Sequence, residues 1–187
     1  MGKTARVIIG IIVIAIILAG FAVSGFNKAR RLNVAVEAQW AQVENQLKRR
    51  FDLIPNLVET VKGYAAQEKT IFLGVAEARK AYFSAPDVAG KARAAGELEG
   101  ALSRLLLLQE RYPELKSNEN FMKLQDSLEG TENRIAVERK RYNDQVRELN
   151  TYATTFPGMF FASWAGVKEA QYFEVPEAQT EAPQVKF

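Results

Sequence analysis

The stretch RRFDLIPNLVETVKGY, from Arg49 to Tyr64, decides how the chain folds. Apolar residues lie at helical spacing on both sides of Pro55, and positions 47, 51, 54 and 58 stay in phase, which favours one helix through the proline. The end signals favour two helices instead. Basic residues at 48–50 suit a last turn, Asp52 suits a cap, and a proline is tolerated in a first turn. We expect a corner at Phe51–Asp52, with one long helix kinked at Pro55 as the alternative.

Upstream of this stretch, the residues from Val7 to Phe26 carry no charge. A helix of about 20 residues spans about 30 Å, the thickness of the hydrocarbon core of a bilayer. We therefore predict a short N-terminal tail (1–6) and a transmembrane helix (7–26), rather than a cleaved signal peptide with AVS at 22–24 as its cleavage site. The predicted anchor includes Val7, Ile12, Ile17, Phe21 and Phe26.

Basic residues follow the apolar span directly, in NKARR at positions 27–31. Clusters of this kind attract anionic lipid headgroups by about 1 kcal/mol per basic residue. We expect Lys28, Arg30 and Arg31 to face the headgroups. Lys3 and Arg6 precede the span, so the charge difference between its two ends leaves the side of the soluble part open.

Apolar stripes at 3.6-residue spacing continue through the rest of the chain and predict helices at 28–50, 53–83, 88–112 and 118–155. No stretch alternates with a period of two, so we expect no sheet. Stripes of this width are buried best in an antiparallel bundle. The predicted fold is all-α: the transmembrane helix, an antiparallel four-helix bundle domain over 27–155 with Trp40 in its core, and a segment with an extended tail over 156–187.

The segment FPGMFFASWAGV, at 156–167, is strongly apolar and aromatic. It could fold back as a lid on the bundle, or lie at the membrane interface, which Trp and Phe favour. A corner at residue 52 would return Phe156 to the bilayer, whereas one long helix would leave it far away. The expected interface or membrane contacts are Phe156, Met159, Phe160, Phe161 and Trp164. The following EVPEAQTEAPQVKF is predicted to be extended.

The composition excludes much of the usual site chemistry. The chain has no cysteine and no histidine, and its net charge is only +3. Thiol and imidazole catalysis and the usual zinc and haem ligand sets are therefore excluded, and charge gives no support to nucleic-acid binding. Glu132 and Arg139 share a helical face and could form a buried site. The simpler interpretations are an interhelical salt bridge, or an apolar stripe wide enough to leave both residues at its edge. We predict no enzyme, no catalytic or metal-binding residues, and no cofactor.

Several long stretches resemble the LemA family. They are LKRRFDLIPNLVETVKGYAAQEKTIF, LSRLLLLQERYPELKSNENFMKLQDSLEGTENRIAVERKRYND, TTFPGMFFASWAG and the ending YFEVPEA with PQVKF. The resemblance implies a bacterial membrane-anchored protein whose soluble part is a four-helix bundle. The family that it resembles has no established enzymatic activity, so the resemblance supplies no catalytic residues to carry over.

Taken together, these features predict a non-catalytic, single-pass scaffold in the bacterial inner membrane. Its expected partners are the lipid bilayer, further copies of itself in a homo-oligomer and other membrane proteins, but not nucleic acid. The alternative is an adaptor or regulator of a membrane protease in envelope stress, which rests on the resemblance alone.

Overall fold

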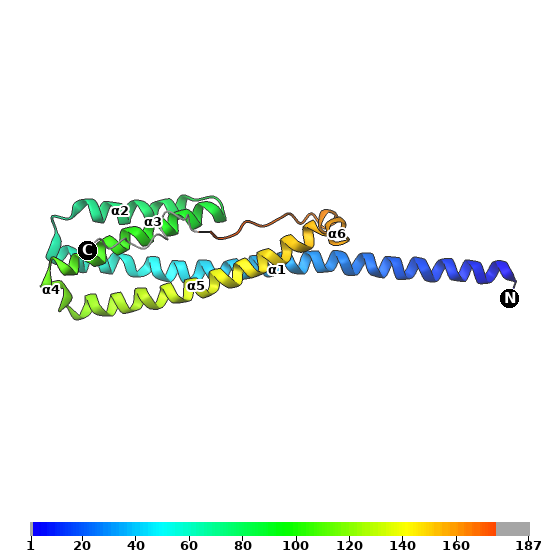
Figure 1. Cartoon of the computed structure of the whole chain (residues 1–187), viewed down its shortest axis with the longest axis horizontal. Helices are drawn as coiled ribbons and strands as arrows, with labels where there is room; N and C mark the ends of the chain where they lie inside the picture. Colours follow the sequence, from blue (N-terminus) through cyan, green and yellow to red (C-terminus); the bar gives the residue numbers. More distant parts are fainter. Residues whose placement is uncertain (1, 175–187) are drawn as a thin grey trace, which may run out of the picture. The chain divides into compact units, whose positions relative to one another are not determined.

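The computed structural model describes residues 2–174, and every regular element in this part of the chain is a helix (Figure 1). The all-α prediction is confirmed, while the tail from residue 175 onward lies outside the described residues. The described chain forms two compact units: unit 1 comprises 2–40 and 144–170, and unit 2 comprises 41–143 and 171–174. The elements are α1 (Lys3–Ala65), α2 (Lys69–Ser84), α3 (Val88–Leu106), the 3-10 helix η1 (Leu107–Glu110), α4 (Pro113–Lys116), α5 (Glu119–Thr154) and α6 (Gly158–Trp164).

Helix α1 runs unbroken through Pro55, so the predicted corner at Phe51–Asp52 is wrong. A proline inside a helix removes one backbone hydrogen bond, here to the carbonyl of Phe51. Packing offsets this cost, because Phe51 and Leu57 are fully buried and Ile54 is 2% exposed. Pro55 itself lies on the exposed side of the helix. The apolar phase that continues through 47, 51, 54 and 58 was therefore the better guide than the end signals.

The reversal occurs instead at residues 66–68. The amide of Glu68 donates to the carbonyl of Ala65, and the amide of Lys69 donates to that of Gln67. The apolar periodicity of the sequence did not reveal this turn. Ala65 and Phe72 are seven residues apart, which is nearly two helical turns, so the apolar positions keep the same helical phase on both sides of the turn. The predicted second helix at 53–83 is thus divided between α1 and α2.

Unit 2 is an antiparallel bundle of four helical segments: the end of α1, then α2, α3 and the first part of α5, which alternate in direction (Figure 1). The side chain of Asp87 accepts from the amide of Gly90 at 2.7 Å and caps α3. Helix α3 buries the small residues Ala92, Ala94, Gly96 and Ala101. The bundle core contains Val61, Val75, Tyr82, Leu98, Leu102, Leu105, Leu115, Phe121 and Ile135.

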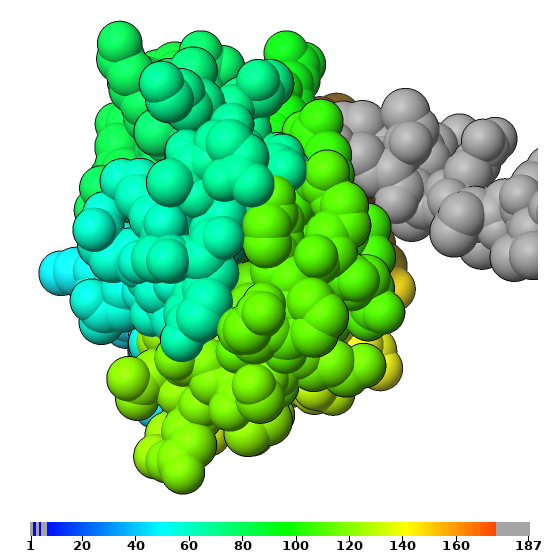
Figure 2. Space-filling view, turned by 90° about the vertical axis from the view of Figure 1, so that its left-hand side faces the viewer, coloured from blue at the N-terminus to red at the C-terminus, as the bar shows by residue number. Residues whose placement is uncertain are grey.

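One end of unit 2 holds the reversal into α5 (Figure 2). Helix α3 ends at Leu106, earlier than the predicted 112, and continues as η1. Pro113 then begins α4, as a proline can, because its missing amide has no partner to lose in a first turn. The side chain of Asn118 accepts from the amide of Phe121 at 2.9 Å and starts α5. The fourth predicted helix, 118–155, agrees with α5 to within one residue at each end.

Unit 1 contains the first part of α1, the end of α5 and α6. Among the described residues, α1 carries the single segment long and apolar enough to cross a membrane, with a mean hydropathy of 3.0 in its most apolar window and none of that window buried. Trp40, expected in the core, is only half-buried. The segment boundaries predicted from the sequence at residues 26 and 155 stay predictions.

Candidate membrane-contact site

Helix α6 is short and held by tight local geometry. A Cβ atom at Gly158 would lie 2.3 Å from the carbonyl oxygen of Tyr152, so only glycine fits at the first residue of α6. At the other end, Gly166 adopts φ +67°, a left-handed conformation that glycine favours. Its amide donates to the carbonyl of Ser163, and the amide of Val167 donates to that of Ala162. This pair of bonds ends the helix and buries Val167.

The aromatic side chains of α6 pack on α1 at the end of the apolar span. The ring centroids of Phe21 and Phe161 are 5.4 Å apart, and those of Phe26 and Trp164 are 5.0 Å apart, both in edge-to-face arrangements. A Cβ atom at Gly25 would lie 2.3 Å from the ring of Phe161. Gly25 therefore lets the two helices approach closely.

The end of α5 is fixed to the same place. The hydroxyl of Tyr152 donates to the backbone carbonyl of Gly25 at 2.9 Å, and the ammonium of Lys28 lies 5.0 Å from the Tyr152 ring centroid. Burial raises the pKa of the Tyr152 hydroxyl. The expected link between a corner and the return of Phe156 to the anchor is therefore wrong. Helix α1 is unbroken, yet α6 contacts it, because the reversal at 66–68 still leaves four alternating helical segments.

The remaining apolar side chains of this segment are open to solvent. Phe156 is 79% exposed, Trp164 62% and Phe160 60%. Met159 is 44% exposed, and Phe161 is half-buried against α1. Of the predicted anchor residues, Val7, Ile12, Ile17 and Phe21 are more than half exposed, whereas Phe26 is half-buried under Trp164. Unit 1 thus presents an apolar helix with an aromatic cluster beside its end, which we call the α6 cluster: Phe156, Met159, Phe160 and Trp164.

Basic residues on α1 follow the end of the apolar span, a few positions after Phe26, which Trp164 contacts. Lys28, Arg30 and Arg31 are all exposed on α1. The Nε–H of Arg31 donates to the carbonyl of Asn27 at 3.3 Å, so that side chain follows its own helix. Cations beside exposed aromatic and aliphatic side chains are the usual composition of a surface that meets a bilayer interface.

Sequence reasoning missed the residues that hold the chain after α6. Asn150 Oδ1 accepts from the amide of Ala170 at 2.8 Å, and its Nδ2 donates to the carbonyl of Ala170 at 2.9 Å. Asn143 binds the amide and carbonyl of Phe173 in the same way. Asn143 and Asn150 are seven residues apart on α5, a spacing that two polar residues on a helical face could have suggested.

The acidic residue singled out in the sequence has a structural partner. The guanidinium of Arg50, on α1, donates to the carboxylate of Glu132, on α5. Arg50 is only 8% exposed. Its ion pair with Glu132 links α1 to α5 within unit 2. Glu132 thus forms an interhelical salt bridge with Arg50, whereas Arg139, the other residue singled out in the sequence, is half-buried on α5. Among residues 2–174, no group of three or more acidic side chains is placed to hold a metal ion.

The model of the LemA family matches residues 39–187. The chain therefore belongs to the LemA family.

Curated relatives extend this finding. The chain is 29% identical over 171 residues to the magnetosome protein MamQ of Magnetospirillum gryphiswaldense, a match that covers 77% of this chain and 63% of the relative. It is 26% identical over 175 residues to magnetosome protein MamQ 2 of Paramagnetospirillum magneticum, covering 80% and 64%. The chain thus spans a little under two thirds of the length of these relatives.

Proposed function

We propose that this protein is a non-catalytic scaffold, anchored in the bacterial inner membrane by the N-terminal part of α1, that acts by self-association and by binding membrane or other proteins. The observation that carries the proposal is the position of the α6 cluster. Helix α6 packs beside the end of the apolar span through Phe161 and Trp164, while Phe156, Met159 and Phe160 stay open. An exposed apolar patch of this kind is covered in use, by lipid or by protein.

Because the apolar span lies beside the α6 cluster, lipid is favoured over protein as the surface that covers the cluster. A chain anchored through residues 7–26 brings the end of that span to the level of the headgroups. Phe21 and Phe26 are in contact with α6, so α6 lies at the same level. Its aromatic side chains then enter the interfacial zone, and Lys28, Arg30 and Arg31 meet the lipid phosphates. The protein would thereby hold the membrane at two points, the span and α6.

A fluorescence experiment tests this proposal. The chain has no cysteine, so Met159→Cys carries a single environment-sensitive dye. Val34→Cys is the control, because Val34 is 57% exposed and lies eight residues beyond Phe26 on α1, which is about 12 Å along the helix. In vesicles that contain a lipid-confined quencher, we expect strong quenching at position 159 and little at position 34. Equal quenching at the two positions would contradict a membrane contact through α6.

A further inference from the structure

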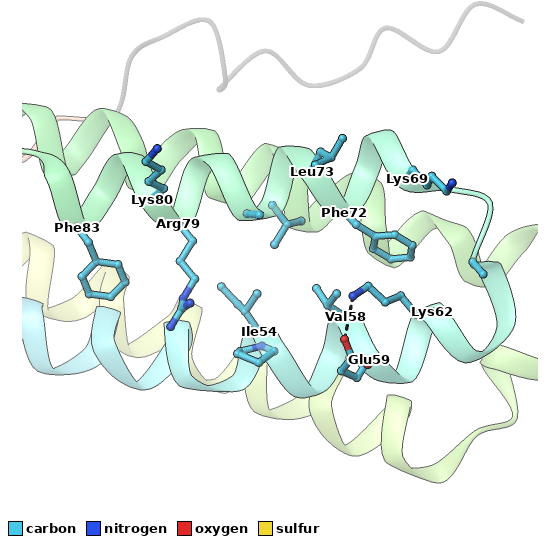
Figure 3. A pocket seen from close by; sticks show the side chains of 14 residues that line it. Ile54, Val58, Glu59, Lys62, Lys69, Phe72, Leu73, Arg79, Lys80 and Phe83 are labelled. Carbon is cyan, nitrogen blue, oxygen red and sulfur yellow. Dashed lines mark hydrogen bonds and ion pairs between the residues drawn. The ribbon is translucent and has the colours of Figure 1, made fainter.

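An open apolar groove runs between α1 and α2 in unit 2 (Figure 3). Its volume is about 750 Å³, and its walls include Ile54 and Val58 from α1 with Phe72, Ala76 and Phe83 from α2. Phe83 is 60% exposed. Along α2 the groove extends from Lys69 to Phe83, which is about 21 Å at 1.5 Å per residue. These dimensions suit one helical face of a partner.

The rim of the groove is basic. Lys62, Lys69, Arg79 and Lys80 line it, against a single acid, Glu59. Lys62 is already paired with Glu59 at 2.9 Å. In Figure 3, Arg79 points across the groove toward α1, and its guanidinium carbon lies 5.6 Å from the Phe83 ring centroid. Within the described part of the chain, Lys69, Arg79 and Lys80 make no ion pair. The groove therefore carries excess positive charge beside an apolar floor.

The start of α5 carries a complementary face, which we call the acidic stripe: Glu119, Met122, Asp126, Glu129 and Asn133. These positions follow helical spacing, so they lie on one face over about 21 Å. All five are exposed, Met122 by 45%. Glu119 is paired with Lys123 at 3.5 Å, whereas Asp126 and Glu129 make no ion pair in the described chain. The acidic stripe therefore presents one apolar side chain, Met122, among carboxylates, and its length equals that of the groove.

We propose that the α1–α2 groove of one copy binds the acidic stripe of a second copy. Met122 would enter the apolar floor, while Asp126 and Glu129 would pair with the cations of the rim. Charge complementarity selects this occupant, because the groove has unpaired cations and the stripe has unpaired carboxylates on the same fold. Figures 1 and 2 place α2 and the first turns of α5 on opposite sides of unit 2, so one copy does not fill its own groove.

This contact is heterologous, since two different surfaces meet. Each copy keeps a free groove at one side and a free stripe at the other, so the contact adds copies head to tail into rings or open rows. The inference rests on the proposed self-association and names the surfaces that produce it. Electrostatic pairing at an exposed rim also makes the assembly sensitive to salt.

Charge reversal tests the pairing directly. The groove variant is Lys69→Glu with Arg79→Glu, and the stripe variant is Asp126→Lys with Glu129→Lys. All four positions are exposed, so both variants should keep the helical circular dichroism of the wild type. Each variant alone, extracted in native nanodiscs, should lose multi-copy particles by about tenfold or more. Co-expression of the two variants should restore them, because the reversed groove pairs with the reversed stripe in alternating copies.

The control and the contrary outcomes separate this inference from the proposed function. Arg93→Glu with Arg104→Glu makes the same charge change at exposed sites on α3 and should leave the particles intact. If the wild type is single-copy, self-association itself is wrong. If the wild type is multi-copy and the groove and stripe variants are too, self-association stands and the groove–stripe contact is overturned. Loss in each variant without recovery in the mixture would also overturn the pairing.

Discussion

Single residues decide whether the α6 cluster can form. Gly25 and Gly158 both lie where a Cβ atom would come within 2.3 Å of another atom, the ring of Phe161 in one case and the Tyr152 carbonyl oxygen in the other. The contact at Gly158 is the more restrictive of the two, because the backbone oxygen of Tyr152 moves less easily than the ring of Phe161. Tyr152 connects the two sites through its bond to Gly25. Nothing in the spacing of these glycines marks them in the sequence, since both contacts are made across the fold.

Tyr142 gives unit 2 a dependence on alkaline pH. Its hydroxyl donates to the carbonyl of Gln171, and burial raises its pKa from 10.0 to about 12. The unfolded chain therefore loses this proton at lower pH than the folded chain does. The associated stabilisation is complete below pH 10 and is lost as the pH rises toward 12. We expect the unfolding free energy to fall over this range in urea titrations.

The Tyr142→Phe variant isolates that contribution. It should be less stable than the wild type at pH 8, by about 1 kcal/mol for one lost hydrogen bond. The difference should shrink as the pH approaches 12. Tyr172→Phe, at an exposed position, is the control. A difference between Tyr142→Phe and the wild type that stays constant with pH would show that Tyr142 does not titrate differently in the folded state.

At the scale of elements, periodicity predicted the helices well and their ends less well. The start of α3 and both ends of α5 follow from Asp87, Asn118 and the apolar stripes. The break between α1 and α2 could not be predicted from the sequence, because the turn at 66–68 keeps the helical phase of the apolar residues and has no glycine or proline. Pro55 gave the opposite signal. The burial of Phe51 and Leu57 outweighed the local preference of Pro55 for a helix end. Local sequence signals do not reveal that burial.

Substitution of Pro55 distinguishes the two helix paths. In the unbroken α1, Pro55→Ala restores an amide that can bond to the carbonyl of Phe51 and should raise the unfolding free energy by about 2 kcal/mol. Pro113→Ala, at the first position of α4, should give no such gain. The measurement is urea unfolding of the full chain in detergent, followed by circular dichroism. A loss of stability in Pro55→Ala would contradict the unbroken helix.

The extended segment after α6 is held by side chains rather than by a sheet. Asn150→Ala removes both bonds to Ala170, and the amide of Ala170 should then exchange with deuterium about tenfold faster, because each lost bond contributes about 1 kcal/mol. Hydrogen-exchange mass spectrometry of the full chain measures this. Asn133→Ala, exposed on the same helix, should leave the rate unchanged. Unchanged exchange in Asn150→Ala would mean that the segment is held by other contacts.

For the whole molecule, composition and the apolar span indicated the class of protein, and the geometry added the sites. The apolar span and the aromatic segment at 156–167 were both visible in the sequence. Their contact through Phe21, Phe26 and Trp164 was not, since it depends on how many helices lie between them. The groove was invisible for a related reason. Its walls come from either side of the turn that periodicity did not reveal.

The number of copies in the membrane tests the scaffold account most directly. The full chain is extracted in native nanodiscs without detergent, and the mass of the protein in each particle is measured. The account predicts particles with several copies of this chain and no other protein in fixed ratio, falling toward single copies as salt screens the groove–stripe contact. Particles that hold one copy, or one copy bound to a different membrane protein, would contradict it.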